Sequence, residues 1–186
     1  MITIRQYRLE DRENVRRVCC HLKPEEPLIE SDRWPLLTIF CDYYIDCEPD
    51  NCFVAVDEDD VAIGYVYCAE NYQRYRKRFM VEYASKLKGQ PFSRRADAWG
   101  AAHMPVFFAR KFPAHLHIDV LEPYQRMGLG HQLVDALAAH LRSKGVPGVM
   151  LVVGRHNVKG RGFYNKYGFK RLRGLPIVVV MALDLT

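Results

Sequence analysis

Residues 114–153 constrain the fold more than any other part of the chain. Residues 114–120, AHLHIDV, alternate between apolar and polar side chains with the period of a β-strand. QRMGLG follows at 125–130, and apolar residues then recur at helical spacing as far as Gly145. The apolar run at 149–153 is typical of a strand covered on both faces. The segment therefore predicts a βαβ unit with a glycine-rich turn and a right-handed crossover.

The turn between this strand and helix has the composition of an anion site. Gly128 and Gly130 lack a Cβ atom, so the backbone can approach a bulky group closely. The N–H groups at a helix start have no partner within the helix, and the helix dipole places partial positive charge there. Together these features favour a phosphate or pyrophosphate. The alternative is that the two glycines only make a tight strand-to-helix turn.

Two motifs in sequence order resemble the GNAT N-acetyltransferases. Residues 125–130 resemble that family's acyl-CoA-binding motif, Q/R-x-x-G-x-G/A, and residues 157–169, NVKGRGFYNKYGF, resemble its N-x-x-A-x-x-F-Y-x-K-x-G-F segment. Pro123 stands one place later than the family's proline, and Gly160 replaces its usual alanine, so the backbone path is open at both points. The resemblance implies an α/β (α+β) GNAT fold, with a mixed six- to seven-stranded sheet flanked by helices.

The resemblance also implies an acyltransferase that moves acetyl from acetyl-CoA to a primary amine by direct attack on the thioester. Backbone groups near the end of the strand would pair with the pantetheine arm, and the loop would hold the pyrophosphate. Lys159, Arg161, Lys166 and Arg126 are candidates for the nucleotide phosphates. The implied cofactor-binding residues are Val120, Leu121, Gln125, Arg126, Met127, Gly128, Leu129, Gly130, His131, Asn157, Lys159 and Lys166. Asn157 is also a candidate helix N-cap, and both roles are compatible.

Four residues are the candidates for acid–base chemistry. In resembling proteins the tyrosine of the Phe-Tyr pair lies beside the coenzyme sulfur, so Tyr164 is the candidate general acid; the alternative is a core tyrosine. Asp119, on the strand that precedes the cofactor loop, is the first choice for the base. His117 is second because an ordinary histidine pKa lies near the working pH, and Glu122 is third.

Neither a metal site nor a disulfide framework is predicted. All six cysteines lie between residues 19 and 68 and form no C-x-x-C pair, which favours buried thiols in a reducing compartment. His115, His117 and Asp119 alternate along one strand, which sets neighbouring side chains about 7 Å apart. With no leader and no long apolar run, we expect a cytoplasmic protein with a single domain over 1–186 and no membrane association.

Charge is spread unevenly along the chain. Residues 1–70 carry 7 basic and 16 acidic residues, 71–112 carry 10 and 2, and 113–186 carry 10 and 4. A basic C-terminal part suits a polyanionic cofactor such as coenzyme A. The acidic N-terminal part suits a cationic acceptor, or is simply a solvated surface.

Residues 71–112 form a basic, aromatic helical insertion between the third and fourth expected strands. A helix is expected from Tyr72 to Tyr83, with a break at 89–91 and a second helical or irregular piece around Trp99. We rank a cap over the active site, or a self-association surface in a homodimer, above nucleic-acid binding. The order of elements after about residue 40 resembles the acetyltransferase-like domain attached to O-GlcNAc hydrolases, here free-standing, so glycoside cleavage is not implied.

The remaining elements follow from local patterns. We expect strands at 2–7, 52–56, 61–68 and 177–183, a first helix from Leu9, a loop at 23–27 and a turn at 171–175. A second helix should run from Trp34 or Pro35 to about Asp46. Its aromatics, with Trp34, Tyr43 and Tyr44 foremost, either line the acceptor groove or belong to the core.

The main alternative to an enzyme is a non-catalytic acyl-CoA-binding module that serves as a sensor or scaffold. The sequence favours the enzyme because the loop, Tyr164 and the candidate bases are all present. The acceptor, a small-molecule or protein amine, is not given by the sequence, because acceptor specificity resides in variable loops.

Overall fold

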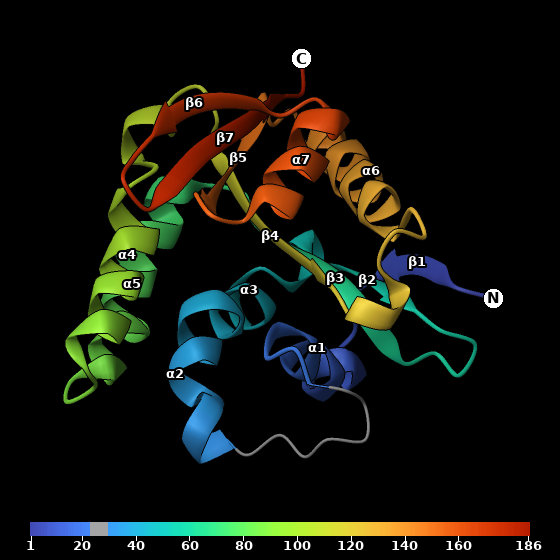
Figure 1. Ribbon diagram of the computed structural model, residues 1–186, viewed down its shortest axis with the longest axis horizontal. Helices are drawn as coiled ribbons and strands as arrows, with labels where there is room; N and C mark the ends of the chain where they lie inside the picture. Colours follow the sequence, from blue (N-terminus) through green and yellow to red (C-terminus); the bar gives the residue numbers. More distant parts are fainter. Residues whose placement is uncertain (23–29) are drawn as a thin grey trace.

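The structure is a computed structural model that describes residues 1–22 and 30–186, without the side chains of residues 30–32. The loop expected at 23–27 lies outside the described residues. A seven-stranded sheet forms the centre, in the order β1-β2-β3-β4-β5-β7-β6 (Figure 1). Its strands are β1 (Thr3–Gln6), β2 (Phe53–Val56), β3 (Ala62–Ala69), β4 (Ala114–Val120), β5 (Gly148–Gly154), β6 (Lys170–Gly174) and β7 (Val178–Asp184).

The sheet is mixed, as the sequence predicted. Only β4 and β5 run parallel, and every other neighbouring pair is antiparallel. Helix α6 connects the two parallel strands, which gives the expected βαβ unit at the centre of the molecule. This unit joins a β1–β4 half-sheet to a half-sheet of β5, β7 and β6.

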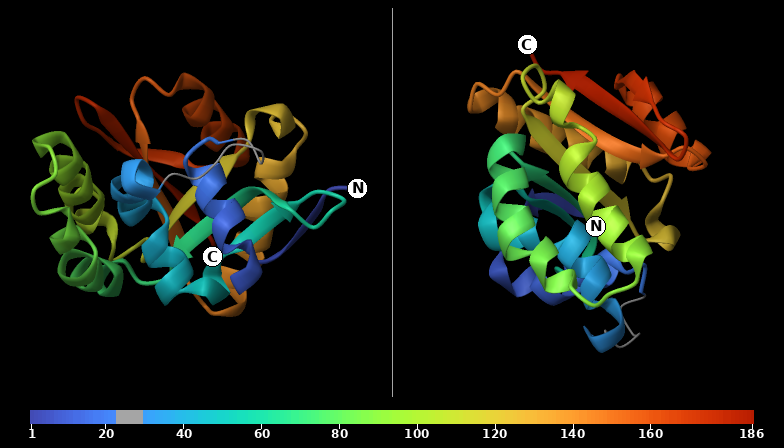
Figure 2. Two further views of the ribbon diagram at one scale, coloured as in Figure 1. Left: turned by 90° about the horizontal axis from the view of Figure 1, so that it is seen from below. Right: turned by 90° about the vertical axis from the view of Figure 1, so that its left-hand side faces the viewer.

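Helices cover the sheet on both faces. The helices α1, α2 and α3 lie on one face of the β1–β4 half-sheet, and α6 lies on the other (Figure 1). Both views place α4 and α5 side by side, at the opposite side of the molecule from α6 (Figures 1 and 2). The helices are α1 (Arg12–Cys19), α2 (Glu30–Phe40), α3 (Asp42–Cys47), α4 (Tyr72–Glu82), α5 (Phe92–His103), α6 (Leu129–Ser143) and α7 (Val158–Tyr167).

Short 3-10 turns join several of these elements. They are η1 (Leu9–Asp11), η2 (Pro49–Asn51), η3 (Ala84–Leu87), η4 (Val106–Phe108) and η5 (Glu122–Tyr124). The first of them precedes α1, so the helix expected from Leu9 opens as a 3-10 turn. The last of them fills the space between β4 and the glycine turn.

Two sequence expectations were wrong. The helix expected from Trp34 to Asp46 is two helices, because Cys41 leaves helical geometry at φ −131° and ψ −64° and the chain turns there. The turn expected at 171–175 is strand β6, which pairs antiparallel with β7. β6 lies at the edge of the sheet and carries exposed cations, so it lacks the apolar alternation of an inner strand; charged side chains are common on edge strands, where they hinder further pairing.

The insertion contributes to the core rather than lying on top of it. Tyr72, Tyr75 and Phe79 of α4 are fully buried. The Tyr72 ring meets the His115 ring of β4 edge-on at 5.6 Å between centroids, and its hydroxyl donates to the Ala101 carbonyl of α5 at 2.8 Å. The insertion therefore packs into the protein from the α3 and β4 side, beside α2, and does not cover the loop that begins α6.

Candidate active site

The parallel strands β4 and β5 separate soon after they meet. They pair at Ala114 with Val149 and at His115 with Met150, whereas β4 stays paired with β3 as far as Val120. Among the described residues, no strand pairs with the β5-facing edge of β4 over residues 116–120. Strand edges with free N–H and C=O groups bind extended ligands by adding a strand. The predicted pantetheine residues Val120 and Leu121 lie at the end of this gap. Their N–H groups already donate to Asp119 Oδ1 and to the Ile63 carbonyl, so neither residue has a backbone N–H left to donate to a ligand arm.

The loop after β4 is held in place by Gln125. Its side-chain Nε2 donates to the Val120 carbonyl at 2.9 Å, which ties the loop to the end of the strand. Arg126 and Gly128 then adopt left-handed backbone conformations, at φ +65° and +83°. In the part of the chain that the structure describes, the N–H groups of residues 126–130 donate to no carbonyl or side chain. Successive free N–H groups at a helix start form an anion-binding concavity.

Glycine is required at the two positions of the loop for different structural reasons. Gly128 is needed for its positive φ, and a Cβ there would meet nothing nearer than 3.9 Å. Gly130 has an ordinary φ, but a Cβ there would lie 3.0 Å from the Phe163 ring of α7. The second glycine therefore lets α6 and α7 approach each other. The N–H of His131, which the sequence placed in the cradle, donates instead to the Gly128 carbonyl at 3.0 Å.

Helix α7 brings the second motif beside this loop. Asn157 is its N-cap, and its Oδ1 accepts a hydrogen bond from the Gly160 N–H at 2.8 Å. A Cβ at Gly160 would lie 2.7 Å from the Asn157 side chain, which accounts for glycine at the position where the family has alanine. Lys159 lies in the first turn, and Lys166 lies in the last, about 10 Å further along the axis. The two lysines therefore lie at opposite ends of the helix.

On the alternating His115, His117 and Asp119 face of β4, His115 is fully buried, whereas His117 and Asp119 are half-buried. Across the ladder, His117 pairs with Tyr67 and Asp119 with Tyr65. The rings of Phe40 and Tyr44 pack edge-on against His117, at 5.6 and 5.3 Å between centroids.

Burial changes the chemistry of His117. It lowers the pKa of His117 to about 4, and the Nε2 atom is buried with no hydrogen-bond partner in the described chain. The reason for ranking His117 as a base, a pKa near the working pH, is therefore wrong, although the residue does lie on the same strand face as Asp119.

Asp119 has two polar neighbours. Its Oδ1 accepts from the Val120 N–H at 2.8 Å, and its Oδ2 lies 3.4 Å from Nε2 of His21, at the end of α1. Burial raises the pKa of Asp119, with the nearby His21 and the Val120 N–H acting in the opposite direction. A buried carboxylate with a raised pKa is a stronger proton acceptor than an exposed one. His21 was missed by sequence reasoning, because nothing local marks a residue so far along the chain from β4.

Tyr164 of α7 faces the same region. Its ring packs edge-on against Phe163 at 5.2 Å and against Phe169 at 5.5 Å. Burial raises its pKa, and the negative charge of Asp119 raises it further, so the phenol keeps its proton at neutral pH. The Tyr164 phenol of α7 therefore lies within electrostatic range of the Asp119 carboxylate of β4. Glu122, the third candidate base, lies beyond them in η5.

Two features are absent from the described residues. In that part of the chain, no group of three His, Cys, Asp or Glu side chains is placed to hold a metal ion. Nor does any described helix have both the length and the apolar character to span a bilayer. All six cysteines are free thiols.

A split parallel pair followed by an anion-binding turn is the arrangement of one family of transferases. Residues 15–169 match the profile of the acetyltransferase (GNAT) family, and the chain belongs to that family. Its structure is similar to the crystal structure of SsHAT, at a TM-score of 0.86 and 26% identity, over 100% of this chain and 98% of that one.

More distant solved structures share the fold. The PaiA N-acetyltransferase from Thermoplasma acidophilum, crystallised with coenzyme A, matches at a TM-score of 0.56 and 18% identity, over 99% of both chains. The ribosomal-protein-S18-alanine N-acetyltransferase from Escherichia coli matches at 0.58 and 16% identity, over 100% of this chain and 95% of that one.

Proposed function

We propose that the protein is an N-acetyltransferase that moves acetyl from acetyl-CoA to a primary amine by direct attack on the thioester. The observation that carries this proposal is the run of free N–H groups at 126–130, set at the open end of an unpaired strand edge. A thioester with a long polar arm and a pyrophosphate is complementary to both features. Acetyl-CoA would supply an activated acetyl group there.

The charges around the loop support the same cofactor. Among the described residues, Arg126, Lys159 and Lys166 have no carboxylate within ion-pair distance, and neither does Arg161. Unpaired cations are countercharges for phosphate groups. We propose that Lys159 and Arg126, at the helix starts, serve the phosphates, and that Lys166 contributes only to the surrounding potential.

We assign the proton transfers to two side chains. Asp119 accepts a proton from the attacking amine as the nitrogen bonds to the acetyl carbon. Tyr164 Oη donates its proton to the sulfur as the carbon–sulfur bond breaks, so that a neutral thiol leaves. The raised pKa of Asp119 suits proton acceptance. The raised pKa of Tyr164 keeps the phenol protonated but makes it a weaker acid, so we assign the donation to Tyr164 on its place in the second motif and not on its pKa.

The acceptor in this proposal is a primary amine that is cationic in solution and loses one proton to water before it attacks, but the acidic N-terminal part supports a cationic acceptor only weakly. Several of its carboxylates are already paired with arginines of the same region, namely Asp11 with Arg5, Asp42 with Arg16 and Asp46 with Arg12. Solved structures that share the fold include an agmatine N-acetyltransferase and a ribosomal-protein-S18-alanine N-acetyltransferase, whose acceptors differ. The fold therefore does not choose between a small-molecule and a protein acceptor.

Within the family, we infer a relationship to the acetyltransferase-like domain attached to O-GlcNAc hydrolases. The supporting feature is the basic, aromatic insertion, which folds as α4, η3 and α5 between β3 and β4. The inference concerns ancestry only and assigns no glycosidase activity to this chain.

The experiment is calorimetric titration with acetyl-CoA of the parent protein and of two variants, Gly128→Asn and Gly128→Asp. Asparagine and aspartate both tolerate left-handed backbone, and the site has room for a side chain, so the pair differs in charge and not in fold. We expect saturable binding to the parent and at least about tenfold weaker binding to the aspartate variant than to the asparagine variant. Equal affinities of the two variants, or no binding to the parent, would contradict the proposal.

A further inference from the structure

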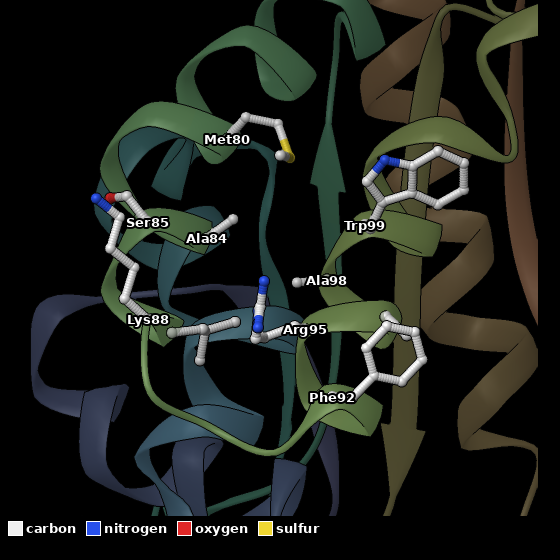
Figure 3. Close-up of a pocket in the computed structure, with 10 residues that line it drawn as sticks. Met80, Ala84, Ser85, Lys88, Phe92, Arg95, Ala98 and Trp99 are labelled. Atoms are coloured by element: carbon white, nitrogen blue, oxygen red, sulfur yellow. The ribbon is translucent and has the colours of Figure 1, made fainter.

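A pocket lies between α4 and α5, away from the loop that begins α6. Its volume is about 570 Å3, within the range of small-molecule sites. Figure 3 shows Met80, Ala84 and Lys88 on one side, Phe92 and Trp99 on the other, and the Arg95 guanidinium between the two helices. The proposed acetyl transfer makes no use of this pocket.

The aromatic wall of the pocket is costly to leave in water. Phe92 is 81% exposed and Trp99 is 58% exposed, although most large apolar side chains of this protein are buried. The Trp99 indole is also held in place, because it stacks on His103 at 4.5 Å between centroids and 12° between planes. Exposed apolar surface around a concavity marks a binding site, and a fixed ring loses little entropy when a ligand covers it.

The charge of the pocket selects the ligand. Lys88 and Arg95 are the charged residues of its lining, and both are cations. In the described part of the chain, neither makes an ion pair or a side-chain hydrogen bond. The hydroxyl of Ser85 is already used, since it donates to the Val81 carbonyl at 2.6 Å. The free polar side-chain groups of the lining are therefore donors, namely the two cations and the neutral Trp99 indole N–H, and donors of this kind are complementary to an anion.

We propose that this pocket binds a small carboxylic acid with an aromatic or branched apolar body. The carboxylate would accept hydrogen bonds from the Arg95 guanidinium, and the body would lie between Trp99, Phe92 and Met80. An arginine fork matches a planar carboxylate with two parallel N–H···O bonds. The concave shape between two helices favours a small ligand over a second copy of the chain, which would need a broader surface.

The test uses the full-length protein and three probes with one body and different charge: 4-phenylbutyrate, 4-phenylbutyramide and 4-phenylbutylamine. The chain has two tryptophans, so a Trp34→Phe variant makes Trp99 the fluorescent reporter. Saturation-transfer NMR on the unmodified protein is the second readout, in case the change at Trp34 disturbs folding. Neither measurement needs acetyl-CoA. A failure of the ligand to bind this pocket can therefore be told apart from a failure of the proposed acetyl transfer.

We expect saturable binding of 4-phenylbutyrate, with a dissociation constant of roughly 0.1–1 mM for a ligand of this size. The amide and the amine should bind at least about fivefold more weakly. Arg95→Met should weaken binding of the acid by a similar factor. Arg94→Met, on the same helix but outside the lining, should leave it unchanged.

Three results would overturn the proposal. The first is equal binding of acid and amide. The second is loss of binding in Arg94→Met to the same extent as in Arg95→Met. The third is absence of binding together with concentration-dependent dimerisation in sedimentation, which would assign the face to a second copy of the chain.

Discussion

At the scale of single residues, position in the sequence is a poor guide to chemical environment. His117 and Asp119 both belong to a face of β4 that alternates like a solvated strand face. The structure covers this face in part, with Phe40 of α2 and Tyr44 of α3 packed on His117 and with His21 beside Asp119, and the pKa values of the two side chains shift in opposite directions. Burial disfavours the charged form of each, so the pKa of His117 falls while that of Asp119 rises.

His117 should make the fold sensitive to acid. Its folded pKa of about 4 lies below its ordinary value of 6.5, so the unfolded chain takes up the proton first as pH falls. Stability is therefore full above pH 6.5 and is lost on the way to pH 4. We expect His117 to account for a loss of about 2 kcal/mol between pH 7.5 and pH 4.5.

Urea unfolding at the two pH values measures this loss. His117→Phe, which suits the aromatic surroundings, should lose about 2 kcal/mol less on acidification than the parent does. The exposed His156 provides the control, since His156→Gln should behave like the parent. An identical acid response of His117→Phe and the parent would show that His117 titrates normally.

Tyr164 is the residue on which turnover should depend, if the proposed acetyl transfer is correct. Removing its hydroxyl removes the proton for the leaving sulfur but keeps the ring packing. Tyr164→Phe should therefore lower kcat by about 100-fold or more, with acetyl-CoA affinity changed less than about twofold. Steady-state assays with an accepted amine, beside calorimetry, separate the two effects.

Tyr167→Phe is the matched control for this measurement. Tyr167 lies on the same helix, and its hydroxyl donates to Asp135 of α6, away from the strand gap. Its variant should keep near-parental kcat. Unchanged turnover in Tyr164→Phe would remove Tyr164 from the proposed chemistry and favour the non-catalytic alternative.

At the scale of elements, α6 and α7 pack closely because α6 has no side chain at the point of contact. Gly130 admits the Phe163 ring, whereas Gly162, on α7, would place a Cβ in open space. Gly162→Ala should raise the free energy of unfolding by about 0.5–1 kcal/mol, because alanine is the better helix former. Gly130→Ala should lower it by about 1–2 kcal/mol, because the ring must shift.

Both changes can be followed by urea unfolding of the protein without ligand. The two variants add the same methyl group to two helices, so each is the control for the other. Equal stabilisation by both substitutions would mean that the contact between Gly130 and Phe163 does not constrain the packing of α6 on α7.

Predictions of helices and strands succeeded where the apolar pattern extended over many residues and failed where it covered only a few. The βαβ unit, the hairpin of β2 and β3, and helix α4 carry enough apolar positions for the period to be read. β6 has five residues, mostly charged, and owes its strand conformation to pairing with β7. The break at Cys41 was invisible for a similar reason, since apolar spacing continues on both sides of it.

At the scale of the whole molecule, the motifs predicted the family and the cofactor loop but not the surroundings of the candidate acid and base. Gln125, Gly128 and Asn157 are recognisable because their roles are local: Gln125 ties the loop to the strand, Gly128 makes the turn and Asn157 caps a helix. The approach of His21 to Asp119 depends on how α1 packs against the sheet. The burial of Tyr72 and Tyr75 of α4 in the core likewise depends on how α4 packs against the rest of the protein. No local pattern encodes contacts between segments so far apart.

The early parting of β4 from β5 has a mechanical consequence. Two residue pairs are the strand-to-strand connection between a half-sheet of four strands and a half-sheet of three. In a protein built this way, two half-sheets are joined over a short length and diverge beyond it. A ligand arm lying along the free edge of β4 would stiffen this short connection. The same contacts that hold the ligand would then also fix the angle between the two half-sheets.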